Sequence, residues 1–250
     1  MTDDGAMKSD LIAERIARFR EAEEEVPATW RAKREFADAV RSLLDVLCAT
    51  DADATTLLAG AAEIQAMADR FGKEPVADEP SGIAEMAFAG METFHDRSPL
   101  VGRANPIAPP LEFSPDPETG VVSGTGFFGN AYEGAPGCVH GGFVGAAFDE
   151  LLGMACIFSG APGMTGRLEV SYRSPTPIRT TLRFEGRYEG RTGRKIRTRG
   201  ELYAGDRLCA EATGLFISID REKFEDLNRL RQQRFSADGK TMAPEKPTRD

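Results

Sequence analysis

The feature that most constrains the fold of this chain is a long, mainly apolar run from Gly142 to Phe158. Only two acidic residues, Asp149 and Glu150, and no basic ones interrupt it, and the run is long enough for several helical turns. A helix that is hydrophobic nearly all round has to be buried nearly all round. The chain must therefore supply a second layer that covers this segment on most sides.

Strand patterns lie on both sides of the apolar run. After it, Leu168, Val170 and Tyr172 alternate with polar residues, and the same period of two recurs over residues 182–189. Before it, the turn-forming sequence PDPETG at 115–120 separates two short apolar segments and predicts a hairpin. These patterns predict an α+β fold in which an antiparallel sheet, buried on one face and charged on the other, curls around a central helix.

The segments outside this core predict an N-terminal appendage and a C-terminal tail. Three amphipathic helices are indicated before residue 75, and the clearest one places its apolar residues on one face. That apolar stripe consists of Phe36, Val40, Leu43, Leu44 and Leu47. The predicted division is a helical extension at 1–75, a linker and entry segment at 76–100, the sheet-and-helix domain at 101–220, and a short helix with a polar tail at 221–250.

Composition narrows the classes of protein to which the chain can belong. Its net charge of −9 disfavours nucleic acid as a general partner, although residues 166–200 carry ten bases against three acids. This basic segment fits either attraction of a small anionic ligand or a solvated sheet face. The polar, acidic start and the charges within the apolar run predict a cytoplasmic protein without membrane insertion. The four cysteines are widely spaced and the two histidines lie far apart, which predicts neither a disulfide framework nor a metal site.

The two acids inside the apolar run are the first candidates for chemistry. They point about 100° apart on a helix, so at least one of them is expected to be buried. Burying a carboxylate without compensation costs on the order of several kcal/mol of folding free energy. A buried carboxylate is therefore tolerated mainly where it is paired with a positive charge, hydrogen-bonded or used in function. Asp149 is favoured because it follows Gly142 by seven residues and so lies about two turns along the same helical face.

The start of the same helix offers a complementary group. Gly141 and Gly142 allow a ligand to approach backbone N–H groups at a helix N-terminus, where they can polarise a carbonyl and hold a developing oxyanion. Seven residues separate Gly142 from Asp149 by roughly 10 Å along the helix axis, too far for both to act on one carbonyl. Two antiparallel copies of the helix would bring Asp149 of one copy opposite Gly142 of the other, which predicts a homodimer with composite sites.

A family resemblance is carried by the string from Gly137 to Gly142, GCVHGG, followed by Asp149. This HGG-x₆-D pattern resembles the signature of the hot-dog thioesterases of the PaaI and THEM4-like type. The resemblance extends from about Ser98 to Ser218 and leaves the N-terminal helices uncovered. It implies a hot-dog fold and an acyl-CoA thioesterase that needs no metal or redox cofactor, with coenzyme A entering as part of the substrate.

The resemblance also implies roles for individual residues. In this family the amide of the second glycine activates the thioester carbonyl, which corresponds to Gly142. The helix acid acts as general base or nucleophile, which corresponds to Asp149, and Thr165 stands where a strand threonine assists. His140 would orient the turn rather than transfer protons.

Further residues are candidates for binding the substrate. Glu150 could exchange roles with Asp149 after a shift of one residue, Gly141 lies beside the carbonyl-binding amide, and Asn130 could contact the carbonyl. Arginine and lysine suit phosphate groups, so Arg173, Arg194 and Lys195 are candidates for coenzyme A. The same basic residues would look identical on a solvated sheet face.

Three alternatives stay open at this level. The chain could be a catalytically silent hot-dog module that binds acyl groups or coenzyme A and recruits a partner through its N-terminal helices. It could instead act on an acyl group held by a carrier protein, or be a dehydratase that uses its histidine as a base. The sequence leaves undetermined the length of the acyl chain and whether the predicted homodimer pairs further into a dimer of dimers.

Overall fold

The computed structural model describes residues 26–74, 96–116, 118–158 and 163–218, together with residues 14, 17, 160 and 226. The first and last predicted helices and the C-terminal tail fall almost entirely outside these residues. The described residues form two compact units, one containing 26–49 and 96–218 and the other 50–74. The described part of the predicted N-terminal extension is therefore shared between the two units.

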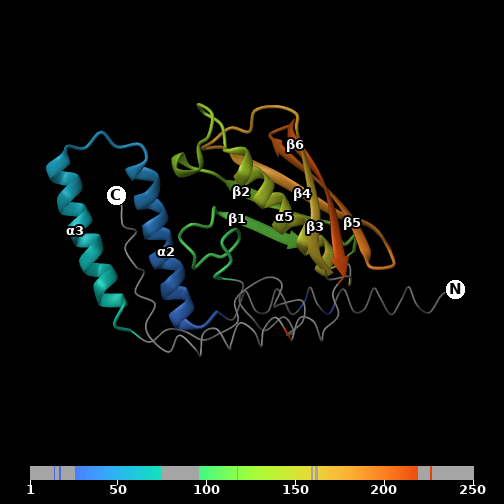
Figure 1. The fold of residues 1–250 in the computed structure, drawn as a ribbon, viewed down its shortest axis with the longest axis horizontal. Helices are drawn as coiled ribbons and strands as arrows, with labels where there is room; N and C mark the ends of the chain where they lie inside the picture. The colour runs from blue at the N-terminus through green and yellow to red at the C-terminus, as the bar shows by residue number, and fades with distance from the viewer. Residues whose placement is uncertain are drawn as a thin grey trace. The chain divides into compact units, whose positions relative to one another are not determined.

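The larger unit is built on one six-stranded antiparallel sheet (Figure 1). Its strands lie in the order β1-β2-β4-β5-β6-β3. They are β1 Leu111–Pro115, β2 Val122–Phe127, β3 Gly163–Tyr172, β4 Thr181–Thr192, β5 Lys195–Ala204 and β6 Arg207–Ser218. The hairpin predicted around 115–120 is confirmed, because β1 and β2 pair across that turn and the Asp116 N–H donates to the Val121 carbonyl at 2.8 Å.

Helix α5, Gly141–Phe158, is the apolar run of the sequence, and it packs against all six strands. Ten of its residues are buried. By length and composition it could also cross a membrane, but in this structure it is the core helix of the sheet. A six-stranded antiparallel sheet around one long buried helix confirms the predicted hot-dog architecture.

Strand glycines allow α5 to approach the sheet closely. A Cβ atom added to Gly186 would lie 2.7 Å from Leu151 Cγ, and one added to Gly200 would lie 3.1 Å from Leu152 Cδ2. These two glycines are directly opposite each other on β4 and β5. The helix therefore rests on a part of the sheet without side chains, where its own leucines fill the space.

Strand β3 differs from its predicted alternation. Leu168 and Val170 are only half-buried, and Tyr172, predicted on the buried face, is 55% exposed. The reason is the position of the strand, since β3 is an edge strand that pairs with β6 on one side. Alternation located the strand, but edge position reduced the cover over its inner face.

Helix α2, Ala28–Leu47, belongs to the larger unit, and its apolar stripe is not the face that packs on the sheet domain. Its buried residues are Trp30, Arg34 and Ala37. These lie about a third of a turn around the helix from the predicted stripe, in which Leu43 and Leu47 are exposed. The packed face of α2 therefore combines two apolar residues with a buried arginine.

Helix α3, Ala54–Phe71, belongs to the smaller unit. Its N-terminus is capped by Asp53, whose side chain accepts from the Thr56 N–H at 2.9 Å. This bond satisfies one of the amides that a helix start leaves without an intrahelical partner. The cap explains why the third predicted helix begins at this point.

Candidate active site

The start of α5 is organised by His140, which lies immediately before the helix. The ring Nδ1 of His140 accepts a hydrogen bond from the Gly142 N–H at 3.1 Å. The backbone N–H of His140 donates to the Tyr132 carbonyl at 2.9 Å. The imidazole thus caps the helix as a polar N-cap side chain does. Accepting at Nδ1 assigns the neutral ring, with its proton on Nε2. The contact gives the Gly142 amide an acceptor within its own chain, and the orienting role of His140 stays a prediction.

Gly141 presents the neighbouring amide. Its carbonyl accepts from the Tyr172 hydroxyl at 2.7 Å, and a Cβ added to it would lie 3.1 Å from that oxygen. No residue that the structure describes accepts a hydrogen bond from the Gly141 N–H. The helix start therefore offers one amide without an acceptor beside one held by His140. Tyr172 was missed as a site residue, because alternation alone placed it in the core.

Asp149 lies two turns further along α5 and is half-buried. Its Oδ1 accepts from the Thr165 hydroxyl on β3 at 2.7 Å. Just after Thr165 the pairing of β3 with β6 shifts by one residue, an irregularity of the kind that often re-aims side chains near functional sites. No residue that the structure describes donates a hydrogen bond to Oδ2 of Asp149. The structure thus brings together the two residues that the sequence paired only by resemblance.

Glu150, the adjacent acid, lies in a different environment. The Ser98 hydroxyl donates to its Oε1 at 3.2 Å. The pKa of Glu150 is raised to about 7, mainly by burial; the Ser98 hydrogen bond lowers it and the negative charge of Asp149 raises it. The two neighbouring carboxyl groups therefore differ in their hydrogen-bond partner. Of the two acids, Asp149 is the one that contacts Thr165, and its choice as the catalytic acid stays a prediction.

Asn130 begins the short 3-10 helix η1, Asn130–Tyr132. Its side-chain amide donates to Oδ2 of Asp45 at 3.2 Å and to the Asp45 carbonyl at 3.4 Å. Both side-chain donors are therefore directed at α2. No signal in the sequence indicated this contact, which joins residues 85 positions apart.

The basic candidates fall into two groups. Arg173 directly follows β3, and the last residue of that strand, Tyr172, pairs with Ala210 near the start of β6. Lys195 pairs with Ile217 near the end of β6. Arg194, beside Lys195, donates to the Ser218 carbonyl at 3.2 Å. Within one chain these groups are separated by most of the length of β6, roughly 20 Å or more.

Several arginines of the basic segment are paired on the sheet face. Arg173 and Arg199 both contact Glu211, and Arg187 contacts Glu201. The Arg173 hydrogen bond is the main cause that lowers the pKa of Glu211. Much of the positive charge counted in the sequence is therefore balanced by neighbouring carboxylates. In the described part of the chain, no cluster of three or more His, Cys, Asp or Glu side chains could hold a metal ion.

Comparison with known proteins covers the segment that holds these residues. A model of the thioesterase superfamily matches residues 136–211. The chain is 33% identical over 93 residues to acyl-coenzyme A thioesterase THEM4 of Mus musculus, covering 36% of this chain and 40% of that protein. It is 34% identical over 100 residues to the protein of the same name from Bos taurus, covering 39% of this chain and 41% of that protein. The chain thus spans about two fifths of the length of these curated relatives.

A solved structure extends the similarity over more of the chain. The crystal structure of RHA08564, a thioesterase superfamily protein, is 31% identical and superposes with a TM-score of 0.68. The match covers 74% of this chain and 90% of that protein. Similarity on this scale reaches well beyond the segment matched by the family model.

Proposed function

Because this chain belongs to the thioesterase superfamily, we propose that it hydrolyses acyl-CoA thioesters to a free acid and coenzyme A. The observation that carries the proposal is the placement of Asp149. A half-buried carboxylate on the core helix, with one oxygen held by Thr165 and the other left for a water molecule, is arranged as a general base. No metal or redox cofactor is needed for this chemistry.

The proposed reaction is a hydrolysis in two steps. Asp149 takes a proton from water, and the resulting hydroxide attacks the thioester carbonyl carbon while the amides at the start of α5 stabilise the oxyanion. The tetrahedral intermediate then breaks its carbon–sulfur bond and expels coenzyme A as a thiolate, which accepts the proton from Asp149. The Gly142 N–H is the predicted hydrogen-bond donor to the thioester carbonyl oxygen. Gly141 supplies a second amide, and donation from Gly142 to the substrate requires His140 to yield or share that N–H.

We further propose that the active unit is a homodimer with composite sites. Gly142 and Asp149 lie roughly 10 Å apart along one helix, so a second copy of α5 is needed to place them on one carbonyl. Strand β3, which carries Thr165, ends the sheet, and pairing with β3 of a second copy would extend the sheet and set the two α5 helices side by side. The same two-fold would bring Arg173 of one copy toward Arg194 and Lys195 of the other, giving the phosphates of coenzyme A a shared cationic site.

A chain-length panel of acyl-CoAs, with release of free thiol as the readout, tests the activity. We expect turnover by the wild type and loss of turnover in Asp149→Asn. Equal rates for the two proteins would remove Asp149 from the mechanism. Binding of acyl-CoA without turnover would favour the silent binding module, and turnover only of carrier-bound acyl groups would favour the carrier-protein reading.

Mixing two inactive proteins tests the composite site. Asp149→Asn removes the base, and Gly142→Val crowds the carbonyl site, because even a Cβ at Gly142 would lie 3.1 Å from His140 Nδ1. If sites are shared across a two-fold, a heterodimer keeps one intact site, and random reassortment restores about a quarter of wild-type activity. Sites within single chains would give no recovery on mixing.

A further inference from the structure

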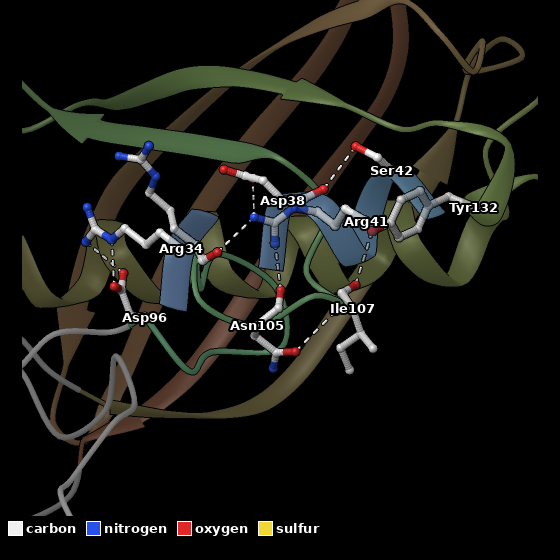
Figure 2. Close-up of polar contacts among 9 residues, drawn as sticks. Arg34, Asp38, Arg41, Ser42, Asp96, Asn105, Ile107 and Tyr132 are labelled. Atoms are coloured by element: carbon white, nitrogen blue, oxygen red, sulfur yellow. Dashed lines mark hydrogen bonds and ion pairs between the residues drawn. The ribbon is translucent and has the colours of Figure 1, made fainter. Parts of the chain in front are cut away.

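Helix α2 is bound to the hot-dog domain by a row of side chains on one of its faces. Arg34 makes a two-pronged ion pair with Asp96, from Nε to Oδ2 at 2.6 Å and from Nη2 to Oδ1 at 2.8 Å (Figure 2). Asp96 is fully buried. Two turns further along, Arg41 donates to the carbonyls of Arg103 and Asn105, both at 2.8 Å. The segment from Asp96 to Asn105 is thereby attached to α2.

Asp45 continues the same face by one more turn and contacts η1 instead. Its Oδ1 accepts from the Asn130 N–H, and its Oδ2 accepts from the Asn130 side chain at 3.2 Å. A Cβ added to Gly129 would lie 2.1 Å from Asp45 Oδ1, so the residue before η1 must be glycine for this contact to form. A carboxylate from a distant helix therefore caps the first amide of η1.

The short helix η1 in turn holds the start of α5. The Tyr132 carbonyl accepts the His140 N–H at 2.9 Å, and the Tyr132 ring packs edge-on against Phe143 with ring centroids 4.9 Å apart. The Tyr132 hydroxyl donates to the Ile107 carbonyl at 3.2 Å, which ties it to the chain just after the segment that Arg41 holds (Figure 2). Burial raises the pKa of Tyr132, while the charge of Arg41 lowers it and that of Asp45 raises it, so both α2 charges reach this ring.

We infer that Asp45 is a positioning residue for hydrolysis, acting through η1 on His140 and on the amides of Gly141 and Gly142. The inference rests on the proposed function, and it assigns α2 to the working enzyme. Asp45 lies at the end of a continuous series of contacts, from its carboxylate to Asn130, through Tyr132 to the backbone of His140, whose ring holds the Gly142 N–H. Displacement of a carbonyl-binding amide by about 1 Å can cost as much as 100-fold in rate.

Two different substitutions interrupt the same contact. Asp45→Ala removes the carboxylate, and Gly129→Ala leaves it in place but drives it away from η1. Gly129 has φ −80°, so alanine can adopt its backbone conformation. We expect each variant to lose about tenfold or more in kcat with little change in KM, because positioning is lost while the substrate-binding surface stays. Asp45→Asn keeps an acceptor for the Asn130 N–H and should recover most of the rate.

A matched control and a double mutant separate positioning from general destabilisation. Glu35→Ala removes an exposed carboxylate from the same helix and should keep wild-type kcat. Because both substitutions break one contact, Asp45→Ala combined with Gly129→Ala should lose no more than the worse single variant. Three outcomes would each overturn the inference. They are wild-type kcat in both single variants, additive losses of kcat in the double variant, and losses of kcat that are fully explained by a lower melting temperature of the variants.

Hydrogen exchange of peptides covering residues 128–145 gives a readout that does not depend on turnover. Faster exchange in Asp45→Ala and Gly129→Ala, but not in Glu35→Ala, supports the mechanical link from α2 to the start of α5. Unchanged exchange refutes that link whatever the activity. An inactive wild type with this exchange pattern would count against the proposed hydrolysis alone.

Discussion

Replacing Glu150 by glutamine should stabilise the protein at neutral and alkaline pH. The carboxyl group is buried beside Asp149, with the Ser98 hydroxyl as its hydrogen-bond partner. Its pKa is raised from the usual 4.5 to about 7, mainly by burial, so the folded protein binds a proton more tightly than the unfolded chain does. A glutamine of the same shape carries no charge at any pH and avoids the cost of ionising this site.

The sign and size of the effect follow from the two pKa values. Because the pKa in the folded state is raised, the stability contributed by Glu150 is fully present below about pH 4.5 and is lost as the pH rises through about 7. At 1.36 kcal/mol for each pKa unit, the complete loss is about 3 kcal/mol. Part of it has already occurred at pH 5, so the advantage of Glu150→Gln should grow by about 2.5 kcal/mol between pH 5 and pH 8.

Urea unfolding of the two proteins at one protein concentration, at pH 5 and at pH 8, measures this difference. Glu189→Gln removes an exposed glutamate and controls for the change in net charge. A second variant, Ser98→Ala, removes the hydrogen bond that opposes the rise in pKa and should widen the gap to Glu150→Gln at pH 8. If the difference between wild type and Glu150→Gln is the same at both pH values, the carboxyl group is not held protonated by burial and the reasoning fails.

Three further outcomes are expected. Thr165→Val keeps the side-chain volume but removes the hydroxyl that holds Asp149, so kcat should fall about tenfold while Thr165→Ser stays near wild type; equal kcat in Thr165→Val and wild type would argue against the contact. His140→Ala removes the cap of α5 and should cost about 1 kcal/mol in urea unfolding, most of which an asparagine at this position should restore. Gly186→Ala forces a Cβ to within 2.7 Å of Leu151 and should lower stability by about 1–3 kcal/mol, and an unchanged midpoint would mean that helix and sheet can separate without cost.

Local pattern was sufficient for much of the fold. A mainly apolar segment as long as α5 favoured a buried helix, and the period of two marked the strands that surround it. The spacing of Gly142 and Asp149 along one helix also followed from the sequence, because helical geometry converts seven residues into two turns. These features depend on residues close together in the chain, whose relations the backbone geometry sets.

Tertiary structure decided which partner each site residue has. Both Asp149 and Glu150 were candidates from the sequence, and only packing shows that one contacts Thr165 while the other is buried against Ser98. Tyr172 alternated like a core residue, yet the edge position of β3 exposes it and places its hydroxyl on Gly141. An edge strand cannot be recognised from the period of its own side chains.

The role of α2 shows the same limit most clearly. Its hydrophobic stripe was legible in the sequence, but its packed face is the one that carries Arg34, Arg41 and Asp45. Ionic and hydrogen-bonding partners have no sequence period, and those of α2 lie 62 to 85 residues away. The sequence by itself determined a helix, a sheet around it and an acid in register with a glycine. Only the folded chain determined which charges meet, because that depends on how distant segments pack.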